Sequence, residues 1–241
     1  TEAQLRIAES VASQVPKALR GEVVDFPVNM PRVQILEGDL VSSYTSLAEK
    51  MGSFASQYMR FSPSLLNLKY RGTLAKQNVA LLRLCFLKGF LSQHHETVSF
   101  VNAEQLAQRI GLRIEEEKDH HFSDYENALK CTLSKHEEDF TIGGVVFSGP
   151  PRLTLINRFV LEMAPTGTIL AIKNNDRPGI IGAIGACLGK HNVNIDQFNL
   201  GRDQKGGEAM ALLRVDEDIE EDVLRELENL PNINFVGKIR L

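Results

Sequence analysis

The stretch Asn-Asn-Asp-Arg-Pro-Gly-Ile-Ile-Gly at residues 174–182 decides the fold of the C-terminal part of the chain. It joins the strand pattern of residues 168–173 to a helix whose apolar face runs from Ile180 to Leu188. Beyond that helix, the pattern predicts a strand, a second strand, a helix and a last strand at residues 194–200, 208–215, 219–230 and 233–239. The order βαββαβ is typical of the ferredoxin-like plan. We expect its two helices to cover one face of the sheet and to leave the other face free to meet a partner.

The region upstream shows a mixture of helix and strand patterns. Apolar residues recur at helical spacing in residues 37–58, 76–92 and 102–109. Shorter apolar runs predict strands at residues 67–75, 98–101, 113–118, 126–135, 140–148 and 152–163. This pattern predicts a mixed α/β domain with antiparallel pairs at its end, and it assigns the whole chain to the α+β class.

Two breaks in composition divide the chain. Pro27 and Pro31 lie in an extended connector, and Ala-Pro-Thr-Gly at residues 164–167 marks a second break. We therefore expect three parts: a terminal helix over 3–20 with a linker in residues 1–30, the mixed domain in 31–164, and the ferredoxin-like domain in 165–241. Pro16 is expected to kink the first helix or to end its first part. Because a lone helix with a linker is not a domain, we expect it to be the last element of a larger unit upstream.

The composition is ordinary for a folded protein and argues against several classes of function. The 241 residues carry 27 Lys and Arg against 31 Asp and Glu, and this net charge of −4 argues against a basic nucleic-acid binder. No run reaches roughly 18 apolar residues, so no membrane span is expected, and no secretory leader is expected from the residues at the start of the sequence. We expect the three scattered cysteines, Cys85, Cys131 and Cys187, to be reduced thiols in a cytoplasmic protein.

The loop at residues 174–179 has the chemistry to bind a small zwitterion. The helix that follows it presents unpaired N–H groups and the positive end of a dipole, which can receive a carboxylate. Pro178 suits the first helical turn and Gly179 lets the backbone approach a ligand. Asp176 offers a carboxylate for an ammonium group, and Asn194 offers an amide. The alternative is that Asp176 only caps the helix and Asn194 is only a turn residue.

Three zones of the sequence resemble known domains, in matching order and spacing. The loop above, together with Asn-Val-Asn-Ile at 192–195, makes residues 168–241 resemble the ACT domain, a small module that binds amino acids. Gly-Pro-Pro-Arg-Leu at 149–153 and the residues up to Gly167 resemble the end of the allosteric substrate-binding domain of D-3-phosphoglycerate dehydrogenases. The opening Thr-Glu-Ala-Gln with its helix, and Val-Asn-Met-Pro at 28–31, resemble the end of the dinucleotide-binding domain. The chain is thus similar to the C-terminal regulatory region of a long-form enzyme of this family.

The resemblance implies an effector site for L-serine, the end product of the pathway, between paired ACT domains of a homodimer or homotetramer. Asn174 and Asp176 would come from one subunit and Asn194 from the other. The implied set of effector-binding residues is Asn174, Asp176, Arg177, Pro178, Gly179 and Asn194. The catalytic residues and NAD would belong to a catalytic part that is missing from this chain, so no catalytic residue and no cofactor are expected here.

The resemblance also implies an anion site, for phosphate or a phosphoglycerate-like molecule, in the middle domain. Arg152 lies at the basic position of the family, Arg214 would reach in from the ACT sheet, and Arg158 is the third candidate. Arginine suits an anion because of its planar fork of donors. The alternative is that Arg152 and Arg158 only form the solvated edge of a hairpin.

The remaining motifs are expected to be structural. The pairs His94-His95 and His120-His121 lack further ligands at metal-binding spacing, so no metal is expected. The glycines at 179, 182, 185 and 189 do not form a dinucleotide fingerprint, and Gly182 and Gly185 are expected to allow close packing of the helix. Two other hypotheses are a free-standing amino-acid-binding protein and an iron–sulfur serine dehydratase. The second would need clustered cysteines, which the sequence lacks.

Overall fold

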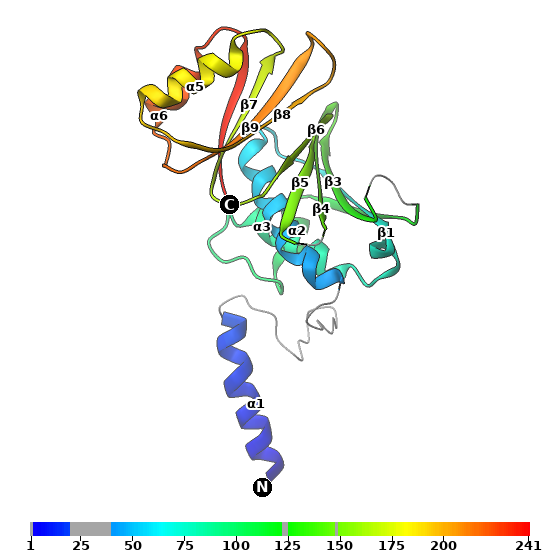
Figure 1. The fold of residues 1–241 in the computed structure, drawn as a ribbon. Coiled ribbons are helices and arrows are strands. Elements are labelled where there is room, and N and C mark those ends of the chain that lie inside the picture. Colours follow the sequence, from blue (N-terminus) through cyan, green and yellow to red (C-terminus); the bar gives the residue numbers. More distant parts are fainter. Residues whose placement is uncertain (1, 20–39, 122–124, 148) are drawn as a thin grey trace.

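The chain folds into two β-sheets with two packed helices between them (Figure 1). The computed structural model describes residues 2–19, 40–121, 125–147 and 149–241. Helix α1 (Glu2–Leu19) continues through Pro16, so of the two expected effects, a kink or an end of the first part, the end is not observed. A proline removes only one hydrogen bond of the helical ladder. The boundary expected at residue 30 lies outside the described residues.

The first sheet has six strands in the order β2-β1-β3-β4-β5-β6. Only β1 and β2 are parallel, and the other neighbours are antiparallel. The strands are β1 (Leu65–Gly72), β2 (Arg113–Asp119), β3 (Asn127–Lys135), β4 (Glu138–Val146), β5 (Pro151–Ile156) and β6 (Phe159–Met163). The helices of this region are α2 (Leu40–Tyr58), the short 3₁₀ helix η1 (Thr73–Lys76), α3 (Ala80–Leu91) and α4 (Ala103–Arg109). Antiparallel pairs at its end were predicted and are observed.

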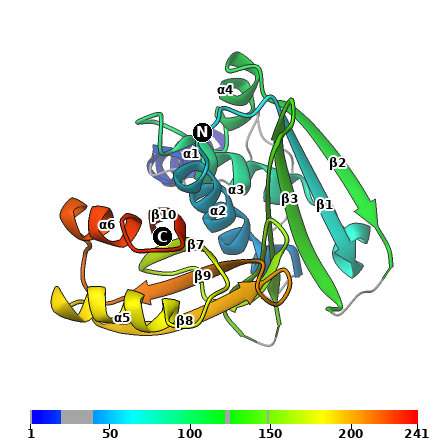
Figure 2. The ribbon, with the colours of Figure 1, turned by 90° about the horizontal axis from the view of Figure 1, so that it is seen from above.

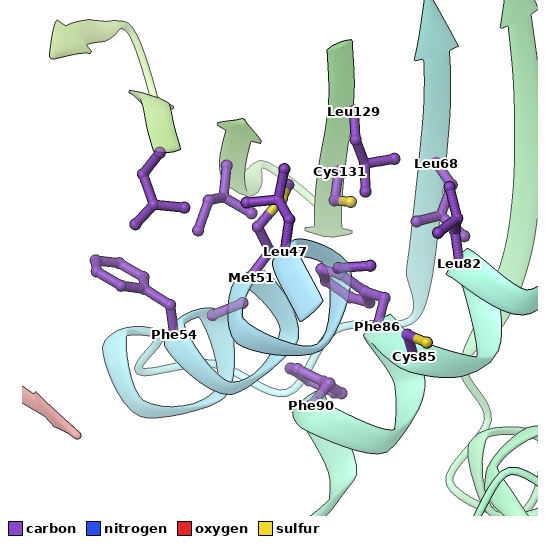
Figure 3. Close-up of a cluster of buried hydrophobic side chains, with 14 of the residues drawn as sticks. Leu47, Met51, Phe54, Leu68, Leu82, Cys85, Phe86, Phe90, Leu129 and Cys131 are labelled. Atoms are coloured by element: carbon purple, nitrogen blue, oxygen red, sulfur yellow. The ribbon is translucent and has the colours of Figure 1, made fainter. Parts of the chain in front are cut away.

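Helices α2 and α3 pack together against this sheet and form its core. Figure 3 shows Met51 of α2 and Phe86 of α3 near Cys131 of β3 in one apolar cluster. The two helices approach so closely that only glycine fits at two points. A Cβ atom on Gly52 would lie 2.1 Å from the carbonyl oxygen of Phe86, and one on Gly89 would lie 1.9 Å from the carbonyl oxygen of Glu49.

Two expectations for this region are wrong. Residues 98–101 form a turn and not a strand, because the Ser99 N–H donates to Asn102 Oδ1 at 2.7 Å and the Ala103 N–H donates to the Ser99 carbonyl. Residues 152–163 form two strands and not one, because Asn157 adopts φ +53° and turns the chain between β5 and β6. Asparagine is among the residues that tolerate this left-handed conformation.

The second sheet has four antiparallel strands in the order β10-β7-β9-β8. The elements are β7 (Thr168–Asn175), α5 (Ile180–Lys190), β8 (Ile195–Arg202), β9 (Glu208–Val215), α6 (Glu221–Glu228) and β10 (Ile233–Arg240). Their βαββαβ order agrees with the prediction, and α5 and α6 cover one face of the sheet (Figure 2). The α+β class predicted for the chain is confirmed.

The second face of this sheet is not free, which overturns the expectation that it meets a partner. Ile169, Ala171, Met210 and Leu212 are fully buried and belong to the core that α2 and α3 share with the first sheet. Helix α2 packs against β10 (Figure 1). The expectation failed because the alternation of apolar and polar residues along a strand predicts which face is apolar, but it does not predict which segment covers that face.

The side chain of Gln57 joins α2 to the outer edge of β10. Its Nε2 donates to the carbonyl oxygen of Arg240 at 3.0 Å, and its Oε1 accepts from the backbone N–H of Arg240 at 3.0 Å. The amide group therefore occupies the hydrogen-bonding positions that a neighbouring strand would use at this residue. Next to it, the ring of Tyr58 lies 4.9 Å from the ring of Phe235, and the burial of Tyr58 raises the pKa of its hydroxyl to about 12.

Candidate functional site

The penultimate residue of β7, Asn174, is a buried asparagine, and only the NH₂ group of its side-chain amide has a hydrogen-bond partner in the described part of the chain. Asn174 is 2% exposed, and its Nδ2 donates to the Asn175 carbonyl oxygen at 2.9 Å. Its Oδ1 is buried and has no hydrogen-bond partner. A buried acceptor without a donor costs free energy and calls for an explanation. One explanation is a bound ligand whose hydrogen-bond donor pairs with this oxygen.

Asp176 faces the β8–β9 turn and does not cap α5. Its Oδ2 accepts from the backbone N–H of Gly206 at 3.0 Å and lies 3.4 Å from Nη1 of Arg202. Its backbone N–H donates to the Gly207 carbonyl oxygen at 2.8 Å. The interpretation of Asp176 as a mere helix cap is therefore wrong. The carboxylate stays partly exposed beside the helix start.

The N-terminus of α5 lacks a side-chain cap. The residue at the N-cap position is Gly179, which adopts φ +95°, a left-handed conformation that favours glycine. Pro178 precedes the N-cap and so lies outside the first helical turn where it was expected. Arg177 and Pro178 are exposed at the rim of the loop. The Ile180 N–H donates to the Arg177 carbonyl oxygen at 3.5 Å, and the next N–H groups of α5 remain able to receive a carboxylate.

Asn194 lies at the opposite end of the same sheet. Its Nδ2 donates to Oδ2 of Asp216 at 2.6 Å, and its backbone N–H donates to Oε2 of Glu217 at 2.7 Å. Asp176 follows β7 and Asn194 precedes β8, and these two strands run in the same direction on either side of β9. Seven residue steps of about 3.3 Å separate the ends of β7, and Asp176 and Asn194 lie beyond these ends, so the two residues are more than about 20 Å apart within one chain. One small ligand cannot contact both.

Two residues that contact Asp176, Arg202 and Gly206, were not expected from the sequence. Both lie in or next to the turn between β8 and β9. The strand order indicates this contact. Because β7 and β8 both pair antiparallel with β9, their C-terminal ends lie at the same end of the sheet. Contacts between the loop at 174–179 and the turn at 203–207 follow from that arrangement.

Arg152 and Arg214 border the contact between the two sheets. Nε of Arg152 lies 3.5 Å from Oε1 of Glu162, while Arg214 pairs with Asp196 and its Nη1 donates to Thr166 Oγ1 at 3.2 Å. Gln197 connects the two regions, because it pairs with Arg214 in the β-ladder and its Nε2 lies 3.5 Å from the Glu162 carbonyl oxygen. These two arginines therefore lie near the same end of β6 and β8.

Arg158 lies at the other end of this contact. It forms ion pairs with Asp203 at 3.2 Å and with Glu208, both in the ACT-like sheet and its turn. Nζ of Lys173 also reaches Glu208, at 2.9 Å. The hydrogen bond from Lys173 lowers the pKa of Glu208, and Arg158 adds to this effect. Arg158 thus connects the β5–β6 turn to the turn that holds Asp176, and the structure does not bring it together with Arg152 and Arg214.

Helix α5 carries an open stripe on the side that faces away from α6. Lys190 and His191 pair with Glu226 on the α6 side. Ile181, Gly185 and Gly189 follow one another at i, i+4 and i+8 on another side, where Ile181 is 54% exposed. A Cβ atom on Gly182 or Gly185 would meet nothing within 4 Å, so the expectation that these glycines allow close packing is wrong within the chain.

The metal-binding, cysteine and membrane-spanning features of the described residues do not add a further candidate site. Within the described ranges, no group of three His, Cys, Asp or Glu residues gathers as a metal site. The three cysteines are buried, and burial raises the pKa of Cys85 to about 12, so this thiol is unreactive near neutral pH. None of the helices in the described part of the chain is long and apolar enough to span a membrane.

Comparisons with known proteins match both sheets to described families. Residues 40–157 match the D-3-phosphoglycerate dehydrogenase intervening domain, and residues 168–232 match the ACT domain. A D-3-phosphoglycerate dehydrogenase of Methanocaldococcus jannaschii is 33% identical over 241 residues, which are 100% of this chain and 46% of that protein. The enzyme of Bacillus subtilis is 32% identical with the same coverage, and that of Mycobacterium bovis is 34% identical over 92% of this chain and 42% of its own length. The chain spans less than half the length of these relatives.

Proposed function

Because the chain belongs to the D-3-phosphoglycerate dehydrogenase family and carries its intervening and ACT domains, we propose that it serves as the regulatory region of such an enzyme. It binds L-serine at the ACT domain for feedback control and an anion at the intervening domain. The NAD-dependent oxidation of 3-phosphoglycerate, the first step of L-serine biosynthesis, takes place in a part of the enzyme that this chain does not span. We place the enzyme in the cytoplasm.

The uncapped start of α5 beside Asp176 carries this proposal. A serine carboxylate binds to the free N–H groups at the helix start, with Arg177 next to them. The serine ammonium group binds to the Asp176 carboxylate. Near the end of β7, the buried Oδ1 of Asn174 has no hydrogen-bond partner among the described residues. Donors for a carboxylate and acceptors for an amine therefore occur side by side, as a zwitterion requires.

A second copy of the chain supplies Asn194 in this proposal. Strand β8 is an edge strand of the ACT sheet. If two copies pair antiparallel along β8 across a twofold axis, the start of β8 in one copy lies beside the end of β8 in the other. Asn194 of one copy then comes next to Arg202 and Asp176 of the other. The exposed side chain of Leu200 at this edge, 41% accessible, supports the same pairing.

The contacts of Asp176 give a route from serine to the intervening domain. Asp176 holds the turn at residues 203–207 through Gly206 and Gly207. Asp203 in the same turn pairs with Arg158 of the β5–β6 turn. Serine acts through this route only if it binds two arrangements of the domains with different affinity. A coupling of about 1–3 kcal/mol would change the affinity or activity roughly 5-fold to 150-fold.

Serine binding tests the effector site. Calorimetry on the chain is expected to show a saturable serine isotherm. Asp176→Ala should weaken serine binding about 10-fold to 100-fold, because it leaves the buried ammonium group unpaired, and Asn194→Ala should weaken it about 10-fold. Asp139→Ala at the exposed start of β4 and Asn229→Ala at the end of α6 are matched controls that should bind serine normally. Unchanged affinity in both site variants would place serine elsewhere.

Phosphate binding tests the anion site. Arg152 and Arg214 near the end of β6 and β8 are the pair that we propose for it. The double variant Arg152→Ala/Arg214→Ala should bind inorganic phosphate at least about 10-fold more weakly, because two charge-assisted donors are lost. Arg109→Ala is the control, because Arg109 is exposed at the end of α4. Retained phosphate affinity in the double variant would rule the proposed site out.

A further inference from the structure

A cavity lies between the ends of α2 and α3, outside the sites described above. It has a volume of about 440 Å³, which is within the usual range for a small-molecule pocket. Part of its wall is apolar and comes from Phe61, Phe90 and Ile110. Phe90 is the α3 residue at the lower edge of the apolar cluster in Figure 3. We call this cavity the α2–α3 end pocket.

The polar part of the wall is basic and holds no acid. Arg60, His94 and His95 line the pocket, and no Asp or Glu is among its lining residues. Among the described residues, the ion pairs include none for Arg60, whose guanidinium lies 5.3 Å from the centre of the Phe235 ring. In contrast, Arg152 and Arg214 each face a carboxylate. A pocket with cationic groups and no counter-charge favours an anion.

A hydroxyl group in the same wall lacks a partner. Ser56 of α2 and Arg60, two residues after the end of α2, both line the pocket. The Ser56 Oγ atom is buried and has no hydrogen-bond partner. Buried hydroxyls are normally paired, so an unpaired one beside a cavity marks a place where a ligand acceptor fits. This observation is independent of the charges.

We propose that the α2–α3 end pocket binds a small organic anion with an apolar body. Its head, a carboxylate or a phosphate monoester, lies between Arg60 and the two histidines, and its body packs on Phe61 and Phe90. This site goes beyond the proposed function, because it shares no residue with the serine loop or with the pair Arg152 and Arg214. Since Arg60 also stacks on Phe235 of β10, an anion here touches a contact between the intervening and ACT domains.

Calorimetric titration of the whole chain tests this proposal with two probes, phenyl phosphate and phenylacetate. At least one probe is expected to bind with saturation, and the probe that binds more tightly identifies the head group. Neutral benzyl alcohol should bind at least about 10-fold more weakly, because it lacks the charge that Arg60 pairs with. Absence of saturable binding by both probes would overturn the proposal.

Variants locate the bound probe. Arg60→Gln should weaken its binding about 10-fold or more, and Arg60→Lys should keep most of the affinity because it keeps the charge. Arg109→Gln is the matched control, because Arg109 is exposed at the end of α4 next to the pocket residue Ile110. This variant should bind the probe with unchanged affinity. The Arg152→Ala/Arg214→Ala variant should also bind the probe normally. Equal affinity of Arg60→Gln and the control, or loss of binding in the double variant, would contradict the assignment.

Discussion

Gly89→Ala is expected to destabilise the intervening domain by at least about 3 kcal/mol, although alanine is the better helix former. The added methyl group would lie 1.9 Å from the carbonyl oxygen of Glu49 and 3.0 Å from the backbone N of Ser53. These are backbone atoms of α2, so they can move only if the two helices separate. Separation would expose the shared core around Phe86 and Met51, both fully buried.

Chemical denaturation measures this loss, with Gly182→Ala as the control. Gly182 lies in α5, where a Cβ atom would meet nothing within 4 Å. Alanine there should leave stability unchanged or raise it by up to about 1 kcal/mol, because it favours the helix. If both alanine variants unfolded at the same denaturant concentration, the close approach of α2 and α3 would not contribute to stability as argued.

Gly185→Glu is expected to abolish both pairing of the ACT domains and serine binding, the latter by more than about 100-fold. In the proposed dimer, α5 lies on the β8 side of the sheet (Figure 2), so the open stripe of Ile181, Gly185 and Gly189 faces its twin across the axis. A glutamate at the middle of the stripe places two like charges opposite each other, which costs several kcal/mol. Each 1.4 kcal/mol is about a factor of ten in affinity.

Sedimentation gives the mass of this variant and calorimetry gives its serine affinity. Ala186→Glu is the matched control, because residue 186 is exposed on the same helix and is turned by about 100° from residue 185. The control should pair and bind serine as the unchanged chain does. A Gly185→Glu chain that matched this control in both measurements would show that copies do not meet along α5 and β8.

Local signals explain which parts of the fold were predictable. The ACT elements were predicted in order because each strand and helix there is bounded by its own turn residues, such as those at 174–179. The covering of the ACT sheet was not predictable, because Gln57 and Arg240 are 183 positions apart in the sequence. The turn at 98–101 was missed because its apolar Val98 and Phe100 favour a strand, while a hydrogen bond that Asn102 Oδ1 accepts from the Ser99 N–H decides the conformation.

Only some features of the candidate site were predictable from the sequence. Asp176 and Gly179 were identifiable because they lie within one loop and their roles depend on the adjacent helix start. The partners of the arginines were not, because charge and type alone do not tell whether Arg158 meets an anion or the acids Asp203 and Glu208. These acids come from a turn that only the three-dimensional arrangement brings to the β5–β6 hairpin.

The Gln57 amide on Arg240 also sets a limit on polymer growth. A sheet with two open edge strands can pair with further copies on both sides and extend into a fibre. In the described part of the chain, the β10 margin is occupied at Arg240 by this amide, and Tyr58 and Arg60 cover Phe235 beside it. In the proposed dimer, a twofold contact along β8 uses the open edge of both molecules. We therefore expect self-association through this sheet to stop at two copies and not to seed a filament.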